Sequence, residues 1–410
     1  MITMLYDELK AKRDQIRSEV EEKEKEPRVL YGMGRPHIYY MRPITELYGF
    51  GVETATRIAM SSIVNVVNKI GWEKYIAGME KIQFPWVSKR SIALKEEVKF
   101  TGDSVFDAKL HTLTWSNGCG FTSGAVYEFD EDHVEEFENW CPQIAALNYM
   151  GLQDEVEELG YWCDAYDACI MADVNAAIDY NHAYCIGKGD KFCKQIVTAR
   201  EDNEPVIKTD RKDGERSLYS IFKEQKQLKR EKYSGDAPEF KVSYDKPLNQ
   251  QDASEEELGK HGSETKFHIA TEAINMGAAM LGWEDFINLI GEKQSYGLEK
   301  AAQDRINEFD ILGTGVKEAA TSVMMGYAGL PFEHSLTKYT DNEVVGIAHS
   351  CPIAEACKEM GVDGTDLSLW CDFYKGFEVH AVNPDIDITH THCIGCGDKY
   401  CRFTIKKAEK

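Results

Sequence analysis

The sequence has neither a long hydrophobic run nor an excess of positive charge. No apolar stretch approaches the ~20 residues that a membrane-spanning helix needs. The formal net charge is −23 at pH 7, so the chain should repel nucleic acid and anionic lipid. The first 25 residues are charged and lack the apolar segment of a secretory signal. We therefore expect a cytoplasmic protein that binds neither nucleic acid nor membrane.

The sequence also shows no sign of a DNA-binding or nucleotide-binding domain, which a sensor protein would need as its output module. The chain has no helix-turn-helix pattern, no basic patch and no phosphate-binding G-x4-G-K-[ST] motif. It also lacks the dense C-x2-C-x2-C run of many ferredoxins, although it contains 12 cysteines. In a reducing compartment, that many cysteines favour metal or redox chemistry over a disulfide framework.

What the sequence does contain is a nine-residue stretch that occurs twice. Cys185–Cys193 reads CIGKGDKFC and Cys393–Cys401 reads CIGCGDKYC. Each copy follows a Cys-Pro pair and a Trp-Cys-Asp triplet, so four cysteines recur in one order: Cys141, Cys163, Cys185 and Cys193, then Cys351, Cys371, Cys393 and Cys401. Four thiolates predict one metal site in each half. Structural tetrahedral zinc is the first interpretation, and an iron–sulfur cluster is the alternative.

The repetition extends well beyond the cysteines. Gly282-Trp283-Glu284 repeats Gly71-Trp72-Glu73, and Glu257-Leu258 repeats Glu46-Leu47 at the same offset. The chain is therefore predicted to be a tandem duplication. Residues 1–207 form the first repeat and 208–410 the second, with the boundary inside the charged segment 200–216. Because duplicated halves commonly reproduce an ancestral homodimer, we expect a pseudo-two-fold internal dimer, with the helices over 53–70 and 265–281 near the shared interface.

The hydrophobic pattern predicts an α+β fold, in which each half has a helical layer and a curved antiparallel sheet around its four cysteines. Helices are expected over 5–25, 53–70, 72–82 (ending before Pro85) and 142–159, strands and turns over 100–127, a hairpin over 125–139, and strands over 172–184 and 191–197. Cys401, Phe403 and Ile405 alternate, so they should share the inward face of a strand. Gln195 departs from this pattern where the second half has Phe403.

Residues that differ between the halves are the catalytic candidates. His392 stands where the first half has Tyr184, and Cys396 stands where it has Lys188. Together with His390 and Asp398 they predict an asymmetric site in the second half, in which a thiol of lowered pKa lies near a base. The matched pairs, His182/His390, Asp164/Asp372 and Asp190/Asp398, have the alternative role of orienting metal ligands.

A strand that ends in Cys-Pro, followed by Cys-Asp and then Gly-Asp-x-x-Cys, resembles the L-2-amino-thiazoline-4-carboxylic acid hydrolase-like family. The C-x7-C loop resembles the zinc-binding 4-vinyl-reductase-type domain. The resemblance covers residues 125–197 and 335–405. It implies a soluble metalloenzyme with two zinc sites per chain that acts on a small nitrogen- or sulfur-containing molecule, most simply by hydrolysis.

Two other functions stay open at this stage. One is a non-catalytic protein that binds or senses a small molecule and contains structural zinc. The other is an iron–sulfur redox protein. The missing output module favours the enzyme. Whether whole chains associate into a homo-oligomer is also open.

Overall fold

The computed structural model describes residues 6–23, 42–120, 124–130, 132–152, 158–202, 204–233, 235, 253–332 and 334–408. Helices and two antiparallel sheets make up this part of the chain, in agreement with the expected α+β class. The chain divides into two compact units. Unit 1 comprises Met1–Asn65 and Phe267–Lys410, and unit 2 comprises Val66–Lys266. No described helix is long and apolar enough to cross a membrane.

Unit 2 is built around a four-stranded sheet of order β1-β2-β4-β3. Its strands are β1 (Gly124–Phe129), β2 (His133–Glu138), β3 (Ile178–Tyr184) and β4 (Cys193–Ala199). β1 and β2 confirm the predicted hairpin, and β3 and β4 confirm strands on either side of the glycine-rich loop. The helices packed on this sheet are α5 (Val105–Ser116), α7 (Gly160–Ala172) and α8 (Leu218–Lys232).

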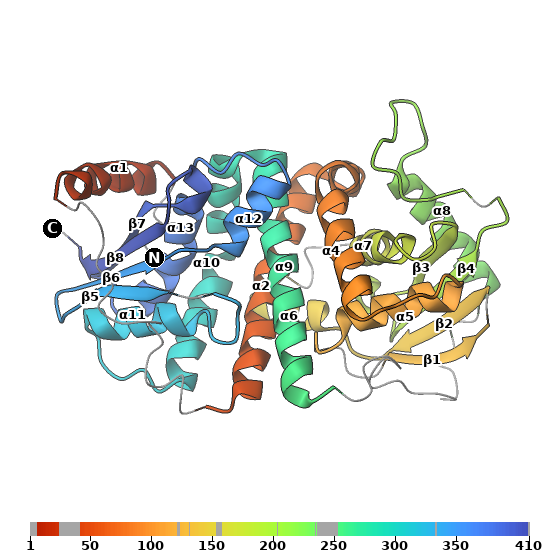
Figure 1. Ribbon diagram of the computed structural model, residues 1–410, viewed down its shortest axis with the longest axis horizontal. Helices are drawn as coiled ribbons and strands as arrows, with labels where there is room; N and C mark the ends of the chain where they lie inside the picture. The colour runs from red at the N-terminus through yellow and green to blue at the C-terminus, as the bar shows by residue number, and fades with distance from the viewer. Residues whose placement is uncertain are drawn as a thin grey trace. The chain divides into compact units, whose positions relative to one another are not determined.

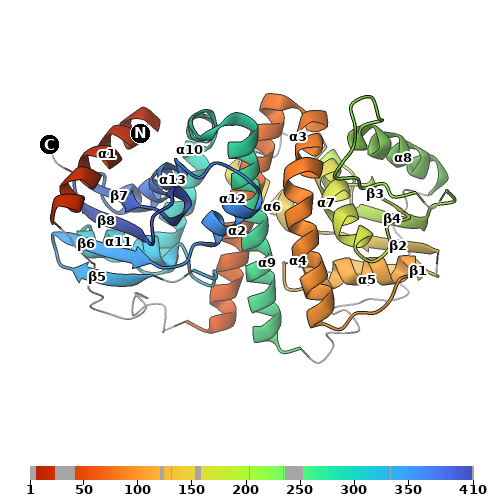
Figure 2. The ribbon, with the colours of Figure 1, turned by 45° about the horizontal axis from the view of Figure 1, so that its top comes forward.

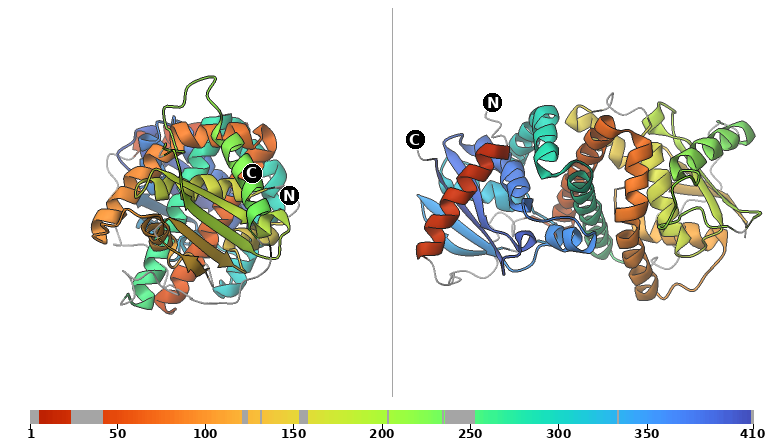
Figure 3. Two further views of the ribbon diagram at one scale, coloured as in Figure 1. Left: turned by 90° about the vertical axis from the view of Figure 1, so that its right-hand side faces the viewer. Right: turned by 90° about the horizontal axis from the view of Figure 1, so that it is seen from above.

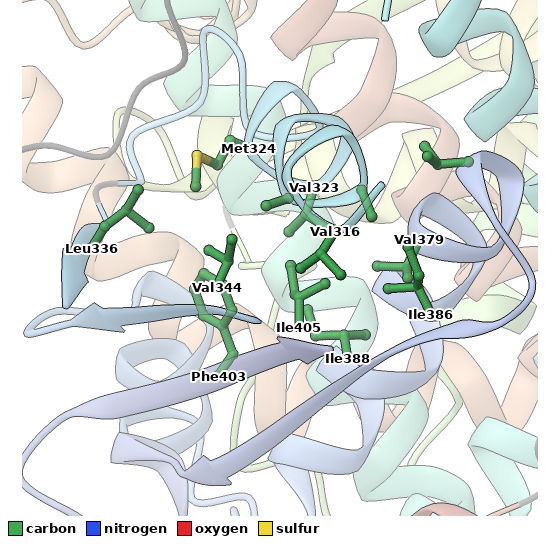
Figure 4. Packing of buried hydrophobic residues seen from close by; sticks show 13 residues of the cluster. Val316, Val323, Met324, Leu336, Val344, Val379, Ile386, Ile388, Phe403 and Ile405 are labelled. Atoms are coloured by element: carbon green, nitrogen blue, oxygen red, sulfur yellow. The ribbon is translucent and has the colours of Figure 1, made fainter. Parts of the chain in front are cut away.

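Unit 1 repeats this arrangement, with strand order β5-β6-β8-β7. Its strands are β5 (Ser335–Tyr339), β6 (Glu343–Ala348), β7 (Ile386–His392) and β8 (Cys401–Lys407), and its packed helices are α1 (Tyr6–Lys23), α11 (Val316–Met325) and α13 (Leu367–Val382). Figure 4 shows side chains from β6, β7 and β8 gathered beneath α11. Phe403 and Ile405 belong to this apolar core, as the alternation in β8 predicted.

Each sheet is covered on its outer face by a helix from a distant part of the chain. In unit 1, α1 lies along β7 (Figures 1 and 3). In unit 2, α8 takes the corresponding place on β3 (Figure 2). By sequence repeat, α1 begins the first half and α8 begins the second. With the predicted division at residues 207 and 208, each half supplies the outer helix for the sheet of the other half.

The two sheets also share their irregularities. β3 has a register shift between His182 and Tyr184, and β7 has one between His390 and His392. A duplicated chain would show such likenesses. The duplication itself, the division at residues 207 and 208, and the pseudo-two-fold pairing stay predictions.

The remaining described helices are α2 (Ile44–Ile70), α3 (Trp72–Gly78), α4 (Phe84–Glu97), α6 (Pro142–Met150), α9 (Glu255–Leu281), α10 (Trp283–Glu308) and α12 (Pro352–Glu359), with a π-helical turn over Met79–Gln83. Strands and turns were predicted over residues 100–127. This prediction is wrong for the first part of that range, which contains helix α5. The reason is local: Ser104 and Asp107 form a capping box that starts a helix.

The predicted helix end before Pro85 is also wrong. The chain continues through the π-helical turn into α4, where Pro85 occupies the first turn. Proline inside a continuous helix removes one hydrogen bond, and Pro85 comes directly after the π-helical turn, where the α-helical hydrogen-bond pattern is already interrupted.

Candidate functional site

The eight cysteines predicted to bind metal lie on equivalent elements of the two units. In unit 2, Cys141 precedes α6, Cys163 lies in α7, and Cys185 and Cys193 bound the turn between β3 and β4. The same places in unit 1 are held by Cys351, Cys371, Cys393 and Cys401. Within each unit the four thiols are near enough for their charges to shift one another's pKa values.

The glycine-rich turn brings the last two sulfurs of each set together. Gly189 has φ of 93° and Gly397 has φ of 94°, a backbone conformation that favours glycine. In unit 2 the turn is closed by the Asp190 N–H, which donates to the Cys185 carbonyl at 3.2 Å. The Ile186 N–H donates to Cys193 Sγ at 3.4 Å. As a result, Cys185 Sγ and Cys193 Sγ lie 3.9 Å apart.

This separation suits two ligands of one metal ion, because sulfurs on a tetrahedral zinc with bonds of about 2.3 Å lie about 3.8 Å apart. In the part of the chain that the structure describes, however, no three or more His, Cys, Asp or Glu side chains are arranged so that they could hold a metal ion. The two four-cysteine sites therefore stay a prediction that rests on sequence order and on the paired sulfurs.

Asp190 and Asp398 hold the turns in place. In unit 2, Asp190 Oδ2 accepts the Cys185 N–H at 2.9 Å, and Arg230 of α8 binds the same carboxylate. In unit 1, Asp398 Oδ2 accepts the Cys393 N–H at 2.8 Å. Arg17 of α1 binds Asp398 at 2.9 and 3.2 Å. These contacts assign a positioning role to Asp398, which the sequence nominated as catalytic.

His182 and His390 make the same contact with a carboxylate of the neighbouring helix. His182 Nδ1 lies 2.9 Å from Asp164 Oδ1, and His390 Nδ1 lies 2.6 Å from Asp372 Oδ1. Their surroundings then diverge. Burial opposes protonation of His182, but Asp164 outweighs burial and raises its pKa. Burial and then the charge of Lys375 lower the pKa of His390, whose Nε2 lies 3.2 Å from Lys375 Nζ.

The structure does not bring His390 and His392 to one face of the sheet. The register shift in β7 pairs His390 with Phe403 and His392 with Arg402, and these two neighbours on β8 point in opposite directions. His392 stacks on Tyr400 at 5.3 Å. The Cys396 thiol donates to backbone oxygens, because its Sγ lies 3.0 Å from the Thr365 carbonyl oxygen and 3.4 Å from that of Gly364. A hydrogen bond with Cys393 lowers the pKa of Cys396 to about 7.

Unit 2 contains a buried cluster of charged and polar side chains that sequence reasoning missed. Lys109 of α5 forms an ion pair with Glu136 of β2, and its Nζ donates to Gln195 Oε1 at 2.5 Å. The Tyr180 hydroxyl lies 2.7 Å from Gln195 Oε1 and 2.8 Å from Asp167 Oδ2. Lys109 and Glu136 are 2% and 1% exposed. Because a buried ion pair is often no more stabilising than apolar residues of similar volume, this cluster is a candidate functional site.

The corresponding positions of unit 1 are mostly apolar. Glu136 pairs with Gln195 across strands β2 and β4, and the equivalent pair across β6 and β8 is Gly346 with Phe403. A side chain at Gly346 would meet the Phe403 ring at 2.2 Å, so the ring occupies the room that the missing side chain leaves. In the alignment of the two repeats, Ala320 is equivalent to Lys109, Ile388 to Tyr180 and Ala348 to Glu138. Lys375 takes the place of Asp167, so unit 1 keeps one charge at these positions but has no equivalent of the Lys109–Glu136 pair.

Two carboxylates in this cluster differ in their electrostatic surroundings. Glu136 has Lys109 as a partner for Oε2, while its Oε1 accepts no hydrogen bond from a described residue. Glu138, two residues along the same strand, is 8% exposed. Burial and then the charge of Glu136 raise the pKa of Glu138 to about 8. One carboxylate is thus paired with an ammonium, and the other favours its protonated form at neutral pH.

A signal for this cluster was present in the sequence. The sequence shows Gln195 at the position equivalent to Phe403. It also shows that the segment Val134-Glu135-Glu136-Phe137-Glu138 aligns with Val344-Val345-Gly346-Ile347-Ala348 of the repeat. Two glutamates on the inward face of a strand are unusual because carboxylates are seldom fully buried. A position-by-position comparison of the two halves would have been needed to find the polar cluster from the sequence.

The family model described as L-2-amino-thiazoline-4-carboxylic acid hydrolase matches residues 260–405, which is less than half of the chain. The matched stretch runs from α9 to β8 and includes the second set of cysteines. No curated protein and no solved structure matches the chain. The family match suggests a hydrolase-like function and agrees with the resemblance in the second half.

Proposed function

We propose that the protein is a hydrolase-like enzyme that acts on a small nitrogen- or sulfur-containing molecule, with its catalytic groups in the buried cluster of unit 2. The family match supports the reaction class. The location rests on one observation: Lys109, Glu136, Glu138, Asp167 and Gln195 form a charged interior where the corresponding positions of unit 1, Lys375 apart, are apolar.

Hydrolysis needs one group that takes a proton from water and one that gives a proton to the leaving atom. Glu136 suits the base, because its Oε2 pairs with Lys109 while its Oε1 accepts no hydrogen bond from a described residue. Glu138 suits the acid, because its environment favours the protonated carboxyl. Gln195 and Tyr180 hold Lys109 and Asp167 in position through the hydrogen bonds described above.

The half that matches the family offers a competing site. Lys375 is 4% exposed, lies next to His390 Nε2, and has its Nζ 4.6 Å from the centre of the Tyr327 ring. Burial lowers the pKa of Lys375 to about 8, which makes it a possible base. The charge of buried Glu378, which forms an ion pair with Arg305, also acts on Lys375. The cluster of unit 2 differs in having one carboxylate paired with an ammonium and a second that favours its protonated form.

The test uses the full chain with L-2-amino-thiazoline-4-carboxylic acid, whose consumption is followed by NMR. Glu136→Gln and Glu138→Gln should each lower kcat about 100-fold or more, as loss of a general acid or base does. Lys375→Met removes the ammonium of the competing site in unit 1 and should leave kcat within about threefold, well short of such a loss. The reverse pattern would move the site to unit 1. Saturable binding without turnover would replace the enzyme by a binding or sensing protein.

We further propose that each four-cysteine set holds one zinc ion in a structural role. The paired sulfurs Cys185 and Cys193 support this, as does the conserved order of all eight thiols in the two halves. A bound zinc would stabilise the turn between β3 and β4 and its equivalent in unit 1. Iron–sulfur clusters are the alternative occupants.

A further inference from the structure

A cavity of about 200 Å³ lies in unit 1 between α1 and the outer face of strands β7 and β8. It is separate from the cysteine turn and from the apolar core on the inner face of the same sheet. The cavity is lined by Lys12, Gln15 and Ile16 of α1, Asp387 and Thr389 of β7, Thr404, Lys406 and Lys407 of β8, and Ala408.

The equivalent space in unit 2 is filled by a lysine side chain. Arg17 of α1 and Arg230 of α8 each bind the aspartate of the cysteine turn in their unit, so they are equivalent. The residues that precede them, Ile16 and Lys229, are therefore equivalent as well. Lys229 Nζ donates to the carbonyl oxygens of Asp179 and Ile196 at 2.9 and 3.0 Å. Ile16 is shorter and carries no donor, so unit 1 keeps a cavity at this place.

The floor of the cavity is polar. Thr389 and Thr404 are a cross-strand pair of β7 and β8. Thr404 Oγ1 accepts a hydrogen bond from Arg402 at 2.8 Å, and Arg402 is 2% exposed. In unit 2 the counterpart of Arg402 is Lys194, which pairs with Glu135 at 2.9 Å. The counterpart of Glu135 is Val345, so the carboxylate that Lys194 contacts in unit 2 has no equivalent at that position of unit 1.

The lining of the cavity carries more positive than negative charge. Among the described lining residues, the three lysines Lys12, Lys406 and Lys407 accompany one carboxylate, that of Asp387. Lys12 contacts Asp387 at 2.6 Å and His380 contacts it at 3.3 Å. The chain as a whole has a net charge of −23. A local excess of lysine on a strongly acidic protein attracts small anions to one place.

We propose that this cavity binds a small anion, a carboxylate or phosphate group on a compact molecule. The lysine ammonium groups supply charge, and the hydroxyls of Thr389 and Thr404 are available as donors to the anion oxygens. A volume of about 200 Å³ is below that of a typical drug-sized site, so the ligand is small. The proposal is independent of the hydrolase assignment, because none of these residues belongs to the cluster of unit 2.

The test is calorimetric titration of the full chain at low ionic strength with inorganic phosphate and, separately, with malonate. Wild type should bind at least one of them saturably at one site per chain. Ile16→Lys places the counterpart side chain in the cavity and should abolish this binding. Lys12→Gln, also the counterpart residue, should weaken it about tenfold. Lys10→Gln removes the same charge from an exposed position of α1 and should leave binding unchanged.

Binding of phosphate alone or malonate alone would identify which anion the cavity selects. Should Ile16→Lys fail to fold, Thr404→Val provides the second variant, because it removes a hydroxyl from the floor at constant shape. The proposal is overturned if neither anion binds saturably to wild type. It is equally overturned if Lys12→Gln and Thr404→Val bind as wild type does.

Discussion

Arg230 of α8 binds both oxygens of Asp190, at 2.9 and 3.1 Å, and so ties the turn between β3 and β4 to a helix 40 residues later in the chain. Asp190 in turn accepts the N–H of Cys185. Arg17 and Asp398 form the same link in unit 1. The geometry of each cysteine turn therefore depends on a helix that comes from the other half of the sequence.

Arg230→Ala should lower the free energy of unfolding by about 1 kcal/mol, since the lost hydrogen bonds are charge-assisted but partly exposed to solvent. Arg17→Ala is the matched change and should have a similar effect. Urea denaturation of both variants measures it. Two variants as stable as wild type would show that the turns need no support from the outer helices.

Breaking the buried ion pair of unit 2 should be much more costly. Lys109→Met leaves Glu136 buried without its partner and should destabilise the protein by about 3–5 kcal/mol. The double variant Lys109→Met/Glu136→Gln removes both charges and should recover most of that loss. A double-mutant cycle by urea denaturation gives the coupling. Additive effects of the two changes would contradict the pairing.

Stability should fall as pH rises, in part because of Glu138. Burial raises the pKa of this carboxyl from its ordinary 4.5 to about 8, so the folded protein binds a proton that the unfolded chain releases in this range. The stabilising contribution is full below about pH 4.5 and is lost as pH rises through about 8. Glu138→Gln should flatten this part of the pH profile in thermal unfolding. An unchanged slope in the variant would assign the effect to other groups.

Metal content decides the role of the cysteines. Purified protein should contain about two zinc per chain and show no visible absorbance band. Cys371→Ser and Cys401→Ser should lower the zinc content and destabilise unit 1, since structural zinc contributes on the order of 10 kcal/mol to folding of small metal domains. Cys163→Ser and Cys193→Ser are the matched changes in unit 2. Iron with absorbance near about 400 nm would establish clusters instead, and equal metal content in all four variants would exclude these ligands.

The location of the cysteine turns and most of the regular elements could be predicted from local sequence. The two copies of Cys-Ile-Gly-x-Gly-Asp-Lys define the turns, because glycine at the positive φ of Gly189 and Gly397 is a local requirement. Alternation in β8 correctly predicted that Phe403 and Ile405 face the core. The same reasoning failed at α5, where the Ser104–Asp107 capping box decided the outcome.

The candidate site could not be predicted in the same way, because its residues meet only through pairing between strands and packing between layers. His390 and His392 are close in sequence, but a register shift turns them to opposite faces of the sheet. Lys109 and Gln195 are 86 residues apart, yet they share a hydrogen bond. The sequence by itself determined the turn chemistry, the periodicity of helices and strands, and the eight recurring thiols, since each depends on neighbouring residues. Tertiary structure alone decided which helix packs on each sheet and which charged side chains are paired in each interior, because both depend on contacts between distant segments.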